Sequence, residues 1–202
     1  MSRTGKPAAP QPRAATSPKR ETLLDAAWRL FYRDGFHAVG IDTVLAEAGV
    51  AKMTLYNHFA SKDDLIVAVL ERRAVEFESS LAAAVEAAGR SPMKRLLAVF
   101  DWHAEWLRSP GFNGCAFIKA VAEFPVLEEK PHQVAAEHKT RVFKLLESLA
   151  AEMPVRQPAV IARQLELLIE GAIVAAHVYG RPEAAKDARM AAEALLKANS
   201  RS

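Results

Sequence analysis

Apolar residues recur at intervals of three and four along almost the whole chain, and this period constrains the fold more than any other feature. Two of the clearest apolar faces lie far apart, at residues 23–31 and at residues 165–176. Such spacing places side chains on one face of an α-helix, whereas a half-buried strand alternates apolar and polar residues. We find no convincing alternating run bounded by hairpin turns. The sequence therefore predicts an all-α fold.

Glycines and prolines divide this pattern into about nine helices. Glycine ends helices well because it adopts left-handed conformations, and proline is favoured in the first turn of a helix. The expected breaks and starts fall at Gly35, Gly40, Gly49, Ser61, Gly89, Pro92, the SPGFNG segment, Pro125, Pro131, Pro158, Gly180 and Pro182. No repeat of fixed period occurs, so a helical solenoid is not expected.

The composition is that of a globular protein. Half of the 202 residues are apolar. No apolar run reaches the roughly 20 residues that a membrane-spanning helix needs, and no apolar segment of a secretory signal follows the charged N-terminus. The single cysteine, Cys115, cannot form an internal disulfide, which fits a reducing compartment. We therefore expect a soluble, cytoplasmic protein with no membrane partner.

Positive charge is concentrated near the N-terminus. Residues 1–62 hold nine Lys and Arg against five Asp and Glu, and the remaining residues hold 18 against 19. Such an excess is typical of a region that contacts phosphates, although a basic tail that only adds solubility has the same composition. Residues 1–18, rich in Pro, Ala and basic residues, are predicted to be a tail without fixed structure.

The stretch GVAKMTLYNHFASK, residues 49–62, has the pattern of the second half of a helix-turn-helix unit. Gly49 supplies the turn, and Val50, Leu55 and Phe59 attach the following helix to its neighbours. The remaining polar and cationic side chains are left outside. A catalytic loop or a solvated helix face would also expose such residues, but this arrangement is the one that lets a short helix enter a DNA major groove.

Residues 23–66, LLDAAWRLFYRDGFHAVGIDTVLAEAGVAKMTLYNHFASKDDLI, resemble the TetR family of transcriptional regulators. The matching elements are the LLDAA-x-x-LF helix, the G-F turn, the A-G-V turn and T-L-Y-x-H-F-x-x-K-x-x-L, in the family's order and spacing. The rest resembles the family's ligand-binding region in its helical architecture, and GCAFIKAVAEFP is similar to a segment of many members. The resemblance implies a helix-turn-helix DNA-binding domain at residues 19–64 and a helical ligand-binding and dimerisation domain at residues 65–202.

The resemblance also implies which side chains contact a double-stranded DNA operator. Lys52, Met53, Thr54 and Asn57 would face base edges, while Tyr56, His58 and Lys62 would contact phosphates. Residue chemistry agrees, because lysine donates to guanine, asparagine can bind adenine in a bidentate way and methyl groups pack on thymine. For Tyr56 and His58, packing against the first helix is the alternative.

Two positions depart from the family pattern. Gly40 stands where a hydroxyl residue usually caps the second helix and touches phosphate, so one contact is expected to be missing. Asp42 stands where a DNA-contacting residue is often found, and phosphates would repel its carboxylate unless it accepts from cytosine. A solvated acid in the first turn of a helix is the simpler interpretation. The operator sequence is therefore not predicted.

Motifs for catalysis are missing from the sequence. We find no G-x-S-x-G, no phosphate-cradling glycine loop and no H-E-x-x-H. We therefore expect no enzymatic activity, no catalytic residues and no cofactor.

Three histidines, His103, His138 and His177, interrupt apolar helix faces. They could be hydrogen-bonded core residues, polar anchors of a ligand pocket or, with Glu123, metal ligands; no metal site is predicted. The resemblance places an effector cavity among the aromatic residues of this region. Its predicted residues are Phe100, His103, Trp106, Phe117, Glu123, His138 and His177. Cys115 beside Lys119 could act as a redox switch, but a buried, inert thiol is the preferred interpretation.

The two C-terminal helices are apolar enough to form a four-helix interface about a two-fold axis. The predicted interface residues are Leu165, Leu168, Ile169, Ile173, Ala188, Ala191 and Leu195. With the resemblance, this pattern implies a homodimeric, ligand-responsive DNA-binding transcriptional regulator, most simply a repressor released from a palindromic operator by a small-molecule effector. The alternative is a helical small-molecule carrier or enzyme that has lost specific DNA binding.

Overall fold

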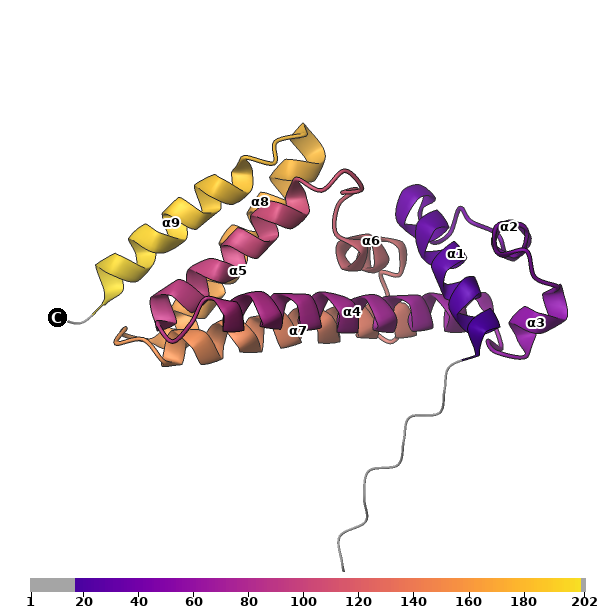
Figure 1. Cartoon of the computed structure of the whole chain (residues 1–202), viewed down its shortest axis with the longest axis horizontal. Coiled ribbons are helices and arrows are strands. Elements are labelled where there is room, and N and C mark those ends of the chain that lie inside the picture. The colour runs from indigo at the N-terminus through magenta and orange to yellow at the C-terminus, as the bar shows by residue number, and fades with distance from the viewer. Residues whose placement is uncertain (1–16, 201–202) are drawn as a thin grey trace, which may run out of the picture.

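The computed structural model describes residues 17–200, which fold into nine helices without a strand. Helices α1 (Pro18–Asp34), α2 (Ile41–Ala48) and α3 (Lys52–Tyr56) form a head at one end of the long helix α4 (Lys62–Ala87) (Figure 1). The body consists of α4, α5 (Pro92–Leu107), α6 (Ala116–Glu123), α7 (Lys130–Ala151), α8 (Pro158–Tyr179) and α9 (Ala184–Asn199). The predicted all-α fold is confirmed.

Helix α4 belongs to both parts of the molecule. Ser61 caps its start, because the Ser61 hydroxyl accepts from the amide of Asp64 at 3.1 Å. The helix then runs for 26 residues without a break, so the boundary predicted between residues 64 and 65 falls inside its first turn. Since a continuous helix is stiff, any tilt of α4 in the body is carried to the head.

The N-terminal boundary differs slightly from the prediction. Helix α1 begins at Pro18, the last residue of the predicted tail at residues 1–18. Proline suits this first turn because the amide it lacks would have no partner in the helix. Residues 1–16 lie outside the described residues.

The head is held by an apolar core and by ion pairs at its edges. Leu23, Phe31, Val44 and Leu55 are fully buried in it. Outside this core, Arg29 of α1 pairs with Glu47 of α2 at 2.9 Å, and Arg72 of α4 pairs with Asp25 of α1 at 2.8 Å. The Arg29–Glu47 pair is exposed and contributes at most about 1 kcal/mol, so apolar burial dominates the stability of the head.

One continuous apolar core extends from the head through the body. Helix α8 packs against α7 and α9, and α9 packs against α5. Helices α8 and α9 lie at the end of the molecule opposite α3 (Figure 1). Within residues 17–200, no helix combines the length and apolarity needed to cross a bilayer.

Candidate functional site

Helix α3 turns its polar side toward solvent because its apolar side is anchored. Gly49 adopts a left-handed conformation, with φ of 64°, and this allows the tight turn between α2 and α3. Leu55 is completely buried and Phe59 is 4% exposed. These two anchors fix which side of the short helix faces outward.

The predicted DNA-contacting residues occupy this outward side to different degrees. Met53 is 69% exposed and Tyr56 is 44% exposed. Lys52 and Asn57 are also exposed, whereas Thr54, His58 and Lys62 are half-buried. We call the four exposed side chains, Lys52, Met53, Tyr56 and Asn57, the recognition surface.

An acidic residue lies beside the recognition surface. Asp42, in the first turn of α2, approaches the ammonium of Lys52 at 3.6 Å, and the two side chains are 87% and 61% exposed. An exposed pair of this kind is weak, so Lys52 remains able to exchange Asp42 for another acceptor. The carboxylate nevertheless reduces the positive charge at this position.

Lys62 has a partner inside the protein. Its ammonium donates to the backbone oxygen of His37 at 3.1 Å, and burial lowers the pKa of this lysine. The contact ties the start of α4 to the α1–α2 turn. An ammonium has three donors, so a phosphate contact by Lys62 stays a prediction.

The α1–α2 turn is bound to the end of α6. The Glu123 carboxylate accepts from the backbone amides of Phe36 at 2.9 Å and of His37 at 2.6 Å, and the His37 Nε2 donates to the backbone oxygen of Glu123 at 2.8 Å. The rings of His37 and Phe124 also lie 4.6 Å apart. Two hydrogen bonds to one carboxylate make this a strong link.

The end of α1 is bound to the segment that precedes α6. The Tyr32 hydroxyl donates to the backbone oxygen of Gly114 and accepts from the amide of Asn113, both at 2.8 Å. The Tyr32 carbonyl accepts from the Asn113 side chain at 2.8 Å and from Lys119 at 3.0 Å. Together, the head–body contacts form what we call the seam. It joins Tyr32, Phe36 and His37 of the head to Asn113, Gly114, Lys119 and Glu123 of the body.

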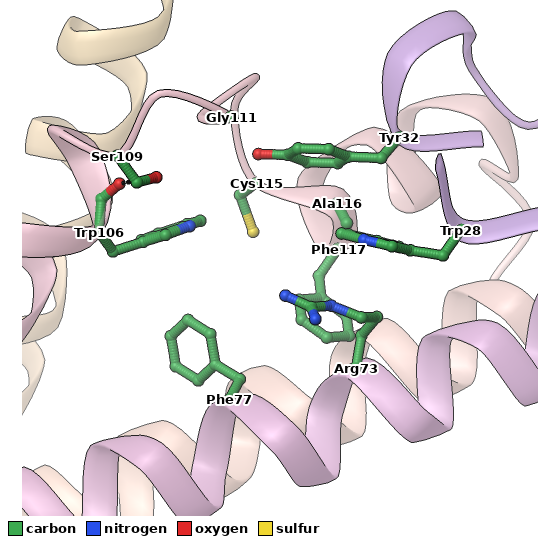
Figure 2. Close-up of a pocket in the computed structure, with 10 residues that line it drawn as sticks. All are labelled: Trp28, Tyr32, Arg73, Phe77, Trp106, Ser109, Gly111, Cys115, Ala116 and Phe117. Carbon is green, nitrogen blue, oxygen red and sulfur yellow. Dashed lines mark hydrogen bonds between the residues drawn. The ribbon is translucent and has the colours of Figure 1, made fainter. Parts of the chain in front are cut away.

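A cavity of about 250 Å³ lies beside the seam. It is lined by Trp28, Tyr32, Arg73, Phe77, Trp106, Ser109, Gly111, Cys115, Ala116 and Phe117 (Figure 2). These residues come from α1, α4, α5, α6 and the segment between α5 and α6. The cavity is therefore shared between head and body.

The effector pocket predicted from the sequence is only partly placed in this cavity. Of the seven predicted residues, Trp106 and Phe117 line it. Phe100, His103 and His138 are buried in the packed core instead, Glu123 belongs to the seam, and His177 is exposed beside Gly114. Against the prediction, the structure therefore does not bring these five residues to this cavity.

His103 and His138 are hydrogen-bonded core residues. His103 Nδ1 donates to the backbone oxygen of Val99, and His138 Nδ1 donates to the carboxylate of Glu78, each at 2.8 Å. Burial lowers the pKa of both histidines to about 4, so both are neutral at pH 7. Across residues 17–200, no three His, Cys, Asp or Glu side chains gather in a way that could hold a metal ion.

Sequence reasoning missed the cavity residues that come from α1 and α4. Trp28, Tyr32, Arg73 and Phe77 are separated by 29 to 89 positions from Trp106 and Phe117. In the sequence, Trp28 lies within the pattern of the first head helix, and Phe77 is one apolar residue of a long helix. Both side chains are only half-buried in the structure, which the sequence does not show.

The dimer interface predicted from the sequence needs revision. Leu165, Ile169 and Ile173 are at most 3% exposed, because they pack into the core of a single chain, and Ala188 is 7% exposed. Leu168 and Leu195 are half-buried and Ala191 is exposed. The exposed apolar residues of the two helices are Leu167, Val174, Val178, Tyr179 and Met190.

Comparison with known proteins identifies the region of the recognition surface. Residues 23–69 match the model of the bacterial regulatory proteins of the tetR family. Over 54 residues, the chain is 48% identical to the transcriptional activator FasR of Mycolicibacterium smegmatis, a match that covers 27% of this chain and only a quarter of the activator's length. Over 111 residues it is 30% identical to the transcriptional repressor NemR of Escherichia coli, covering 54% of this chain and 56% of the repressor.

A solved structure extends the similarity to the body. A TetR-family transcriptional regulator from Streptomyces coelicolor superposes with a TM-score of 0.83 at 33% sequence identity. The match covers 91% of this chain and 96% of that regulator. Head and body are therefore both shared with it.

Proposed function

Since this chain belongs to the TetR family of DNA-binding transcriptional regulators, we propose that it is a homodimeric repressor that leaves a palindromic operator when a small-molecule effector binds. The observation that carries the DNA-binding role is the recognition surface, whose polar side chains extend from a helix anchored by Leu55 and Phe59. The family is bacterial, and bacterial chromosomal DNA lies in the cytoplasm, so we also propose a cytoplasmic location.

Helix α3 would enter the major groove while α2 crosses the backbone. Lys52 and Asn57 carry donors for base edges, and Met53 offers an apolar surface to thymine methyl groups. Thr54 is half-buried, so we assign it a smaller share of the contacts. Tyr56, His58 and Lys62 would contact phosphates and set the position of α3 in the groove.

We propose that the dimer forms through the outer faces of α8 and α9. On α8, Leu167, Gly171, Val174 and Val178 follow each other at steps of three and four, which places them on one face, and all four are exposed. Met190 and Ala191 continue the apolar surface on α9. An apolar face of this kind, at the end of the body far from α3, fits a two-fold interface that leaves both heads free.

The effector response would pass through α4 and the seam. Helix α4 is continuous from body to head, and the seam bonds the α1–α2 turn to α6. A ligand that favours another arrangement of these elements changes the separation of the two heads, so that they no longer fit adjacent major grooves. The match to the repressor NemR spans 111 residues and so extends beyond the head into the body. This similarity supports repression rather than activation.

Selection from a random pool of double-stranded DNA tests this function. The purified protein should enrich an inverted repeat, and Asn57→Ala should weaken binding to the selected site by about 1–3 kcal/mol. Lys144→Ala, on the exposed side of α7, is the matched control and should bind as the unmodified chain does. Failure to enrich any sequence would contradict the proposal.

The dimer assignment has a separate test. Val174→Glu should give monomers in light scattering because a charge would be buried in the interface, and these monomers should bind the inverted repeat poorly. Lys144→Glu, exposed on α7 and outside the proposed interface, is the control. If instead the protein ignored DNA and turned over a small molecule, the carrier or enzyme alternative would replace the repressor.

A further inference from the structure

The cavity beside the seam has walls from both parts of the molecule. Trp28 and Tyr32 belong to α1 of the head, and Phe77 and Trp106 belong to α4 and α5 of the body. Figure 2 shows the open space between the indole of Trp106 on one side and that of Trp28 on the other. A molecule in this space would touch head and body at once.

The walls of the cavity are mostly aromatic. Five of its ten lining residues, Trp28, Tyr32, Phe77, Trp106 and Phe117, carry aromatic rings. Trp28 and Tyr32 stack at 4.6 Å, and Phe77 meets Trp106 edge to face at 5.6 Å. Rings arranged as both faces and edges favour a flat aromatic guest, since each wall can stack on it or meet its edge. A volume of about 250 Å³ admits a guest of one or two rings.

Arg73 supplies the charge of the cavity. Of the ten lining residues it is the one with a cationic side chain, and its guanidinium lies 4.2 Å from the ring centre of Trp28. It forms an ion pair with the Glu76 carboxylate through one nitrogen, Nη1. A guanidinium has five N–H donors in a plane, so further donors can bind an acceptor inside the cavity. Figure 2 shows the group reaching toward the open space.

We propose that this cavity binds a planar aromatic monoanion, an aromatic carboxylate, with its carboxylate on Arg73 and its ring between Trp28, Phe77 and Trp106. Stacking on Trp28 fixes the plane of the guanidinium, which favours a bidentate contact with a carboxylate. The regulatory consequence of this site rests on the proposed repressor function. The binding site itself does not.

The position of Tyr32 connects the cavity with the head. Its ring lines the cavity, while its hydroxyl holds Asn113 and Gly114 at the seam. A ring pressed against Tyr32 therefore acts on the contacts that position α1. Occupation of the cavity should change how the head is held without any contact at the recognition surface.

Calorimetric titration with 2-naphthoate tests the site in the absence of DNA. Two matched probes separate charge from shape: 2-naphthamide keeps the ring but is neutral, and decahydro-2-naphthoate keeps the charge but is not planar. The unmodified protein should bind one 2-naphthoate per chain at least about tenfold more tightly than either matched probe, because charge-assisted bonds and aromatic stacking are both needed.

Arg73→Gln provides the second arm of the test. This variant should lose the preference for acid over amide, while Arg90→Gln, an exposed arginine beyond the end of α4, should keep it. Equal affinity of the unmodified protein for acid and amide would overturn the proposal even if Arg73→Gln failed to fold. Absence of saturable binding by 2-naphthoate, or a preference for the acid that survives in folded Arg73→Gln, would also overturn it.

DNA binding is measured separately, so that the two proposals fail differently. A protein that binds 2-naphthoate but enriches no DNA sequence keeps the site and loses the repressor function. A protein that holds its inverted repeat equally well with and without saturating 2-naphthoate keeps the site and loses its regulatory role. Weakened DNA binding in the unmodified protein, with a response at least about tenfold less sensitive in Arg73→Gln, supports both.

Discussion

The recognition surface and the seam both involve the three-helix head, yet they are built in opposite ways. The side chains of the recognition surface extend into solvent, and Met53 alone leaves 69% of its area exposed. At the seam, Tyr32 and Glu123 satisfy their polar atoms through bonds to residues 81 to 87 positions away. The polar groups of the recognition surface remain available to a partner, whereas those of the seam are hydrogen-bonded and fix the orientation of the head on the body.

Because of this difference, the affinity for DNA and the position of the head depend on different residues. A substitution on the recognition surface removes contacts that exist only with DNA, so it should leave the stability of the free protein nearly unchanged. A substitution at the seam leaves donors such as the part-buried Phe36 amide without their charged acceptor, so it should destabilise the protein and release the head. The two regions can therefore be separated by measuring unfolding and DNA binding on the same variants.

Glu123→Ala should have the largest effect on stability. It removes the acceptor of the Phe36 and His37 amides, and we expect a loss of about 3 kcal/mol in the free energy of unfolding, since bonds to a charged acceptor contribute about 1.5–3 kcal/mol each. Urea denaturation measures the loss. Glu128→Ala, exposed on the turn after α6, should cost less than about 0.5 kcal/mol. Equal stability of the two variants would contradict the claim that the seam stabilises the folded chain.

Acid should weaken the body through its buried histidines. The pKa of His103 is about 4 in the folded chain against 6.5 for the free side chain, so the unfolded state binds more protons between these values. The stability that neutral His103 contributes is fully present above pH 6.5. It is lost as the pH falls toward 4, at up to about 1.4 kcal/mol in the free energy of unfolding per pH unit. His103→Leu should therefore show a shallower loss of stability between pH 6.5 and 5. An unchanged slope would show that His103 is not kept neutral by burial.

Asp42→Asn should have the smallest effect, and only on DNA binding. It removes the carboxylate beside Lys52 and a charge that phosphates repel, so affinity for the selected site should rise by about 1 kcal/mol. Titration at several salt concentrations measures the change. Lys52→Ala should lower affinity instead, by about 1–3 kcal/mol at particular base pairs. Weaker binding by Asp42→Asn would mean that the carboxylate itself contacts DNA.

The sequence predicted well what short segments determine. Gly35, Gly49 and Gly180 follow the ends of α1, α2 and α8, and Ser61 caps α4, as expected from local patterns. The exposed side of α3 also follows from a local pattern, since two apolar anchors fix the rest of a short helix. These features needed no information about the partner of any residue.

The seam and the cavity could not be predicted, because their residues meet only in the folded chain. Nothing near Glu123 in the sequence indicates that it accepts from the amides of Phe36 and His37. The predicted dimer-interface face of α8 differs from the exposed face for another reason. This helix is apolar on both sides, so the sequence does not show whether Leu165 or Leu167 faces the core. Only packing shows that Leu165 is buried and that Leu167 is 71% exposed.

A distance measurement between head and body tests the central claim, that the seam holds the recognition surface in place. Nitroxide labels at Ala46→Cys on α2 and Lys144→Cys on α7, in a Cys115→Ser background, report this distance by pulsed electron resonance when labelled chains are diluted with unlabelled protein. Both label positions are exposed. The intact seam should give one narrow distance distribution, and Glu123→Ala should broaden or shift it while Glu128→Ala leaves it unchanged. An identical narrow distribution in Glu123→Ala would contradict the account.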